Sequence, residues 1–144
     1  MGSVKSVEDL KSAIDAGAQF AVSLGFQEEI GEFAKEKEIL YIPGVASATE
    51  IMTALSCGFN LLKFFPAEQL GGLKMLNALS PVLPSVRFIP TGGISAATAK
   101  DYLSHKSVVA VGGSWMLNSS LLENQNYKEL QQSIADALAL TRDI

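Results

Sequence analysis

The chain has 144 residues, of which 48% are hydrophobic and 18% are charged, so it is long enough for one packed core and too apolar to be disordered. Its formal net charge of -4 comes without any cluster of Lys and Arg, which argues against nucleic acid and against an anionic membrane surface as partners. No apolar run approaches the roughly 20 residues that span a bilayer, the first residues lack a secretory signal, and Cys57 is the single cysteine, so we expect a cytoplasmic protein without disulfides.

Five short runs rich in β-branched and aromatic residues predict strands. They occupy residues 18–24, 39–45, 60–65, 86–91 and 108–113. Their starts lie 20 to 25 residues apart when counted from Gln19, Ile39, Leu61, Val86 and Val108. The segments between them have apolar residues at helical spacing, and a last amphipathic segment, residues 126–140, predicts a final covering helix. Strands that alternate with helices in this way predict βα units and a parallel sheet covered by helices.

Residues at the ends of the helical segments support this division. Ser6 and Ser47, the latter with Glu50 three residues on, are typical helix caps, and Gly17 and Gly58 are typical helix stops. The pattern contains no linker and no low-complexity tract, so we expect one α/β domain over residues 1–144. An open doubly wound sheet and a part of a (βα) barrel both fit at this point.

The carboxyl ends of the predicted strands carry glycine pairs in the sequences PTGG and VGGSW. Function in both architectures lies at these strand ends, and glycine lets backbone N–H groups approach an oxyanion. A helix that begins near Ser95 would add a favourable dipole. We therefore predict a phosphate cradle built from these two glycine pairs, with Thr91 and Ser114 beside them. The alternative is that each glycine pair only makes a tight turn.

Lys63 stands in the middle of the apolar run NLLKFF, on the same face of the predicted strand as Leu61 and Phe65. Desolvation in an apolar interior disfavours the charged amine and lowers its pKa. A neutral amine is a nucleophile that condenses with a ketone to a Schiff base. The alternative is a lysine that extends its ammonium to water from a strand end.

The segments GAQFAVSLGF, YIPGVASATE, LLKFFPAEQLGGLKML, VRFIPTGGIS and VVAVGGSWML together resemble the 2-keto-3-deoxy-6-phosphogluconate (KDPG) and 4-hydroxy-2-oxoglutarate aldolase family over about residues 2–118. The resemblance implies a (βα)8 barrel and a class I aldolase without metal or other cofactor, which cleaves a keto acid to pyruvate and an aldehyde. It implies that Lys63 is the Schiff-base lysine and that Thr91, Gly92, Gly93, Gly113 and Ser114 form the phosphate-binding turns. It also implies substrate-binding roles for Phe65, Ser3 and Leu24.

The chain departs from the family pattern in ways that affect function. The N-terminal βα units of the family have no counterpart here, so we expect an incomplete barrel of about five strands. The family's proton-shuttling glutamate and substrate-binding arginines are among the missing residues. Arg87 and Arg142 are the only arginines, neither is placed to bind substrate, and Glu68 is the nearest carboxylate that could act as a base. Activity could thus be lost, which leaves two alternatives: a non-catalytic phosphate or keto-acid binding remnant, or an inactive folding unit.

An incomplete barrel would leave open edges at the strands that begin at Gln19 and Val108, and it would uncover the inward side chains Phe20 and Val22. We therefore expect a homo-oligomer, a trimer by family resemblance or a dimer that pairs the open edges. The alternative is a reordered sheet in which a helix covers the former interior. The other expected partner is a small keto acid or a phosphorylated sugar acid.

Overall fold

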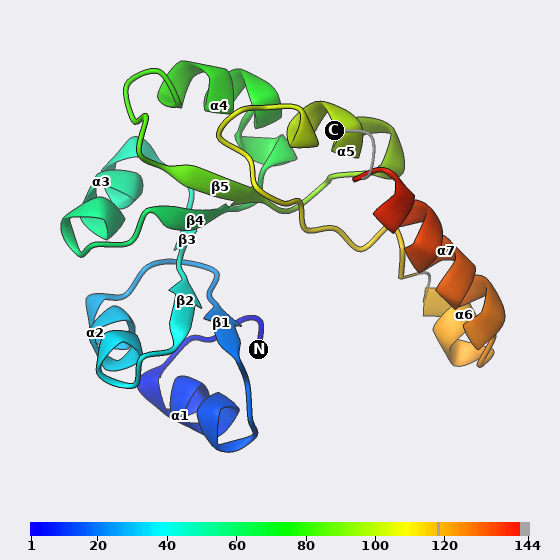
Figure 1. The fold of residues 1–144 in the computed structure, drawn as a ribbon, viewed down its shortest axis with the longest axis horizontal. Helices are drawn as coiled ribbons and strands as arrows, with labels where there is room; N and C mark the ends of the chain where they lie inside the picture. The colour runs from blue at the N-terminus through cyan, green and yellow to red at the C-terminus, as the bar shows by residue number, and fades with distance from the viewer. Residues whose placement is uncertain (118, 142–144) are drawn as a thin grey trace.

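Short parallel strands alternate with helices along the chain (Figure 1). The computed structural model describes residues 1–117 and 119–141. The strands are β1 (Phe20–Val22), β2 (Leu40–Ile42), β3 (Gly44–Val45), β4 (Leu61–Phe64) and β5 (Arg87–Pro90). The helices are α1 (Val7–Asp15), α2 (Glu28–Glu36), α3 (Ala48–Ser56), the 3-10 turn η1 (Glu68–Leu70), α4 (Gly72–Leu79), α5 (Ala96–Leu103), α6 (Ser119–Glu123) and α7 (Tyr127–Ala139). The α/β class and the parallel βα units predicted from the sequence are confirmed.

The strands pair in chain order, so the alternative of a reordered sheet is wrong. β1 pairs with β2 in one sheet, and β3, β4 and β5 pair in that order in a second sheet. The single strand predicted over residues 39–45 is instead two strands, β2 and β3, which separate at Pro43. Proline has no N–H to donate to a neighbouring strand, so the ladder is interrupted at this residue.

Two further extended segments join the sheets through isolated bridges. Val4 bridges Ser23 beside β1, and Val22 N–H donates to the carbonyl of Met1 at 2.9 Å. At the other side, Phe88 bridges Val108 and Thr91 bridges Gly112. The fifth strand predicted over residues 108–113 is therefore not a continuous strand but a segment with one bridge to β5 and one to the residue that follows β5.

The helices α1 to α5 lie along one side of the curved row of strands (Figure 1). Leu62, Phe64 and Phe88 face these helices and are fully buried. On the other face Phe20 is 47% exposed, Leu40 is 54% exposed and Val109 is 52% exposed. None of the helices α1 to α5 covers this second face, which therefore leaves apolar side chains exposed.

Two hydrophobic clusters form the core. One, under β3 to β5, includes Phe64, Phe88 and Leu76, and the other, under β1 and β2, includes Tyr41, Ile30 and Leu10. Phe26 and Phe59 contact both clusters, with their ring centroids 5.7 Å apart. The helix ends behave as predicted: Ser6 and Ser47 cap α1 and α3, with a full capping box between Ser47 and Glu50. Gly17 and Gly58 follow these helices with positive φ.

The C-terminal part differs from the prediction. A helix over residues 126–140 is confirmed as α7, with the Asn126 side chain as its N-cap, but α6 before it has no strong sequence signal. Both helices extend away from the layered part of the molecule (Figure 1). Leu130 is the buried apolar residue of α7, and Leu138 is 56% exposed, so α7 is not a covering helix of the sheet. No helix within the described ranges has the length and apolarity to cross a membrane.

The close approach of two loops at Gly44 should make Gly44→Ala strongly destabilising. A Cβ at this buried position would overlap the backbone carbonyl of Leu24, which cannot move as a side-chain end does. We expect a loss of about 2 to 3 kcal/mol in the free energy of unfolding, measured by urea denaturation. The control is Gly25→Ala, one residue from the same carbonyl, where a Cβ meets no atom within 4 Å. Its expected change is within about 0.5 kcal/mol, and equal losses in both variants would contradict the close approach.

Candidate active site

Two glycine turns lie side by side at the carboxyl end of β5. Thr91 bridges Gly112, so the turn after β5 and the segment before Ser114 are held together. Gly92 has φ 101° and Gly93 has φ 79°, conformations that other residues rarely adopt. Within residues 1–117 and 119–141, the N–H groups of Gly92, Gly93, Gly113 and Ser114 donate no hydrogen bond. Unpaired N–H groups that converge from two turns suit an anion.

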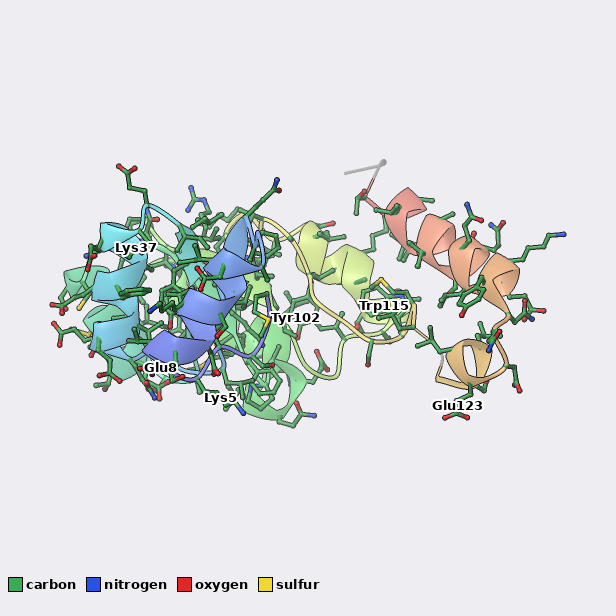
Figure 2. The ribbon with its side chains drawn as sticks, turned by 90° about the horizontal axis from the view of Figure 1, so that it is seen from below. Lys5, Glu8, Lys37, Tyr102, Trp115 and Glu123 are labelled. Atoms are coloured by element: carbon green, nitrogen blue, oxygen red, sulfur yellow. The ribbon has the colours of Figure 1, made fainter. Side chains whose placement is uncertain are left out.

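A cavity of about 460 Å³ opens between these turns. It is lined by Phe65, Thr91, Gly92, Gly93, Ile94, Gly113, Ser114 and Trp115. Six of these eight residues are candidate site residues from the sequence. Trp115 forms one wall, because its ring packs so closely on Gly113 that a Cβ there would overlap it. Figure 2 shows Trp115 where the layered part gives way to α6 and α7.

Lys63 lies on β4 beside this cavity, in register with Gly44 of β3 and Ile89 of β5. Its side chain is half-buried, and burial lowers the pKa of its amine from the ordinary value. Its Nζ lies 4.6 Å from the centroid of the Phe65 ring, within the range of a cation–π contact. It makes no ion pair with any described residue. Desolvation without a carboxylate partner is what favours the neutral, nucleophilic amine.

Backbone hydrogen bonds tie the end of the lysine strand to the glycine turn. Ala67 N–H donates to the carbonyl of Thr91 at 2.8 Å, and Glu68 N–H donates to the carbonyl of Gly92 at 3.1 Å. Gly93 in turn lies against the Glu68 side chain, since a Cβ on it would come within 2.7 Å of Glu68 Cβ. The segment after β4 and the turn after β5 therefore form one connected rim for the cavity.

Glu68, the nearest candidate base, is engaged elsewhere. Its carboxylate accepts a hydrogen bond from the hydroxyl of Tyr102 on α5. Burial, together with this carboxylate, raises the pKa of Tyr102 well above its ordinary value. Glu68 also lines a different cavity, of about 340 Å³, between α4 and α5. Sequence reasoning did not identify Tyr102, and its spacing of three residues from the buried Ala99 indicates only a place on the covered face of α5.

Ser3 and Leu24 do not line the cavity beside Lys63. Ser3 is exposed with φ 57°, and Leu24 is 43% exposed and lines a separate cavity of about 170 Å³ with Val4 and Phe26. The carbonyl of Leu24 lies against Gly44, which is the register partner of Lys63. The two residues are thus near the same end of the sheet but outside the group formed by Phe65 and the glycine turns.

Ser23, next to Leu24, is a buried residue that sequence reasoning missed. Its Oγ donates to the carbonyl of Gly25 at 2.5 Å, and the Tyr41 hydroxyl lies 2.8 Å from the same Oγ. Gly44 N–H donates to this Oγ at 3.3 Å. The Ser23 hydroxyl therefore holds the Leu24 loop against β3.

No arginine of the described residues lines the cavity beside Lys63. Arg87 begins β5, at the end opposite the glycine turns, as predicted, and Arg142 lies outside the described residues. The described ranges contain no group of three or more His, Cys, Asp or Glu side chains that could hold a metal ion.

Comparison with known proteins places this geometry in a family. The family model described as "KDPG and KHG aldolase" matches residues 1–133. The KHG/KDPG aldolase of Escherichia coli K12 is 41% identical over 137 residues, which are 95% of this chain and 64% of that protein. The chain therefore spans slightly less than two thirds of the length of that curated relative.

Solved structures agree with the family match. KDPG aldolase from Legionella pneumophila, with pyruvate captured at low pH as a covalent carbinolamine intermediate, is 39% identical with a TM-score of 0.90, over 96% of this chain and 66% of that one. A cube-shaped protein cage designed by fusing symmetric oligomeric domains is 27% identical with a TM-score of 0.74, over 96% of this chain and 57% of that one. The matched residues include β4 with Lys63 and both glycine turns, and the chain belongs to the KDPG and KHG aldolase family.

Proposed function

We propose that this chain carries the Schiff-base half of a class I aldolase site, with Lys63 as the nucleophile toward a 2-keto acid. The observation that carries the proposal is the half-buried Lys63, whose pKa is lowered by burial and whose Nζ lies over Phe65 beside a cavity of unpaired N–H groups. The covalent pyruvate adduct of the Legionella relative supports the same chemistry for the family.

The chemistry follows from the neutral amine. Nζ attacks the ketone carbon, and the resulting carbinolamine loses water to give a protonated imine. The C4 hydroxyl then gives up its proton to water as the C3–C4 bond breaks, and an aldehyde leaves. The electron pair of the broken bond forms the C2=C3 double bond of an enamine, while the imine nitrogen takes up the electron pair of the C=N double bond. Protonation at C3 and hydrolysis then release pyruvate and regenerate the amine. Phe65 packs beside the bound keto acid and supplies a surface without competing hydrogen bonds.

The glycine turns hold the far end of the substrate. The N–H groups of Gly92, Gly93, Gly113 and Ser114 are four donors toward a phosphate, with Thr91 beside them and the N-terminus of α5 adding its dipole. KDPG and 4-hydroxy-2-oxoglutarate are both candidate substrates, because each presents a 2-keto acid to Lys63. Ser3 and Leu24 are proposed as further substrate contacts on the family resemblance alone, since neither lines the cavity beside Lys63.

The order of the βα units supports the interpretation that residues 1–144 form one domain and that this domain is a contiguous part of a (βα)8 barrel. Chain-order pairing and helices on one face are what such a part would have. The exposed apolar side chains Phe20, Leu40 and Val109 favour association of copies into a homo-oligomer, either a trimer or a dimer that pairs open edges.

A second candidate function is keto-acid and phosphate binding without turnover. Its support is that no Asp, Glu, His or Arg of the described residues lines the cavity beside Lys63, and that Glu68 is paired with Tyr102. General acid–base catalysis contributes about 10²- to 10⁴-fold to such reactions, so Schiff-base formation would persist while cleavage slowed by that factor.

Borohydride reduction in the presence of pyruvate tests the proposal. We expect one reduced pyruvate to attach covalently at Lys63, detected by mass spectrometry of the intact chain and of its peptides. Lys63→Met, similar in bulk without the amine, should remove the adduct, and Lys100→Met, at an exposed position of α5, should retain it. An adduct of equal yield in Lys63→Met would overturn the assignment of Lys63.

The pH dependence of the amine provides an independent test. Because burial lowers the pKa of Lys63, the amine should lose its proton at a pH below 10.5, its ordinary value, and the rate of pyruvate trapping should rise with pH through that lower value. The measurement is an NMR titration of the Lys63 Cε resonance, with a lysine model peptide as reference. A titration midpoint at or above that of the peptide contradicts the desolvated site.

Phosphate binding tests the glycine turns. Inorganic phosphate should shift the amide resonances of Gly92, Gly93, Gly113 and Ser114. Gly93→Val should abolish these shifts, because φ 79° strains a β-branched residue and its side chain would meet Glu68. Gly2→Val is the control, since a Cβ there meets nothing within 4 Å, and pyruvate trapping at Lys63 reports that both variants are folded. Unchanged shifts in Gly93→Val would exclude the turn as the binding site.

A further inference from the structure

A further cavity, with two positively charged lining residues, lies at the opposite end of β5, away from Lys63. Its volume is about 170 Å³, and it is lined by Ser80, Leu83, Pro84, Arg87, Lys106 and Ser107. The lining comes from the end of α4, the connection to β5 and the turn after α5. Backbone pairing holds these parts together, because Phe88 N–H donates to the carbonyl of Ser107 at 2.7 Å. We call it the Arg87 cavity.

Arg87 is oriented before any ligand is present. Its Nη1 donates to the carbonyls of Pro84 and Val86, both at 3.0 Å. These two bonds fix the plane of the guanidinium and leave the N–H groups of Nε and Nη2 without a partner among the described residues. A guanidinium held in this way offers a fork of donors that matches an oxyanion.

Lys106 adds a second positive charge to the same cavity. The lining contains no Asp or Glu, and among the described residues neither Arg87 nor Lys106 forms an ion pair. The cavity therefore has an uncompensated charge in a chain whose net charge is -4. An exposed lysine elsewhere needs no partner, but two cations on one small concave site raise the local concentration of anions.

Ser80 provides a buried hydroxyl without a partner. Its side chain is 4% exposed, and its Oγ makes no hydrogen bond with any described residue. Every side-chain polar atom in the described ranges that is fully enclosed has a hydrogen-bond partner. Because the Ser80 Oγ has none, it cannot be fully enclosed, and part of the small exposed area of Ser80 belongs to this hydroxyl. Ser107, 3% exposed, already pairs with His105, whose Nδ1 lies 2.9 Å from the Ser107 Oγ. Ser80 is therefore the hydroxyl that remains to donate to a ligand.

We propose that the Arg87 cavity binds a small tetrahedral oxyanion, of the phosphate type, through the guanidinium of Arg87, the ammonium of Lys106 and the hydroxyl of Ser80. A volume of about 170 Å³ accommodates such an ion with a few waters at roughly 30 Å³ each. The site goes beyond the proposed aldolase chemistry, because the length of β5 separates it from the glycine turns. That length is about 13 Å for four residues at the usual rise of a strand.

The experiment is an NMR titration of the full chain with inorganic phosphate, read separately at the two sites. We expect saturable shifts at the amides of Ser80, Lys106 and Ser107, apart from those at Gly92 and Gly93. Arg87→Gln should weaken binding at the Arg87 cavity about ten-fold, as expected for loss of a charge-assisted donor fork. Lys106→Gln, an exposed change that leaves the β5 pairing intact, should weaken it about three-fold.

Lys11→Gln is the matched control, since it removes one positive charge at an exposed position of α1 that lines none of the cavities described above. It should leave the phosphate titration unchanged at both sites. All three variants should keep pyruvate trapping at Lys63. A failure of trapping in the unmodified chain would speak against the aldolase proposal and not against the Arg87 cavity, because the two sites are read separately. Shifts confined to the glycine turns, or equal affinity in Arg87→Gln, Lys106→Gln and Lys11→Gln, would overturn the proposed site.

Discussion

Side chains alternate across a strand, and along β4 this alternation decides which groups share the candidate active site. Leu62 and Phe64 are fully buried under the helices, and each gains roughly 2 kcal/mol from removal of its apolar surface from water. Lys63 between them must therefore face the uncovered side. The packing of its two neighbours holds the amine at a place that its own hydration would not favour, which is the origin of its lowered pKa.

The electrostatics of the site follow from what surrounds this amine. The glycine turns offer N–H dipoles without net charge, so they attract an anion but repel the ammonium form of Lys63 less than a full positive charge at the same place would. A carboxylate beside Lys63 would serve as a proton shuttle but would also raise the pKa of the amine. Glu68 is hydrogen-bonded to Tyr102 and does not line the cavity beside Lys63, so the proposed imine formation has more support among the described residues than proton transfer has.

Features set by local sequence were predictable, and features set by distant contacts were not. The period of two on β4 identified the face of Lys63, and the caps at Ser6 and Ser47 identified the helix starts. Pro43 is visible in the sequence, but whether it divides the strand depends on which neighbouring strand would have accepted a hydrogen bond from an N–H at this position. The Glu68–Tyr102 bond joins residues 34 apart, and α7 lines a cavity together with the distant residues 108–111, so neither arrangement has a local signal. Resemblance selected Ser3 and Leu24 together with Lys63, although their side chains lie outside its cavity.

The division of the sheet at Pro43 has a consequence for how the molecule opens. Each of the two clusters has its own strands and helices, and aromatic rings at Phe26 and Phe59 join them. Such an arrangement makes each part a separate cooperative unit, which can unfold at a lower free energy than the whole chain. Transient opening of α1, β1, α2 and β2 then leaves β4, β5 and the glycine turns paired with one another. Amide hydrogen exchange within this chain is thus expected to be uneven, with greater protection on the side that carries Lys63.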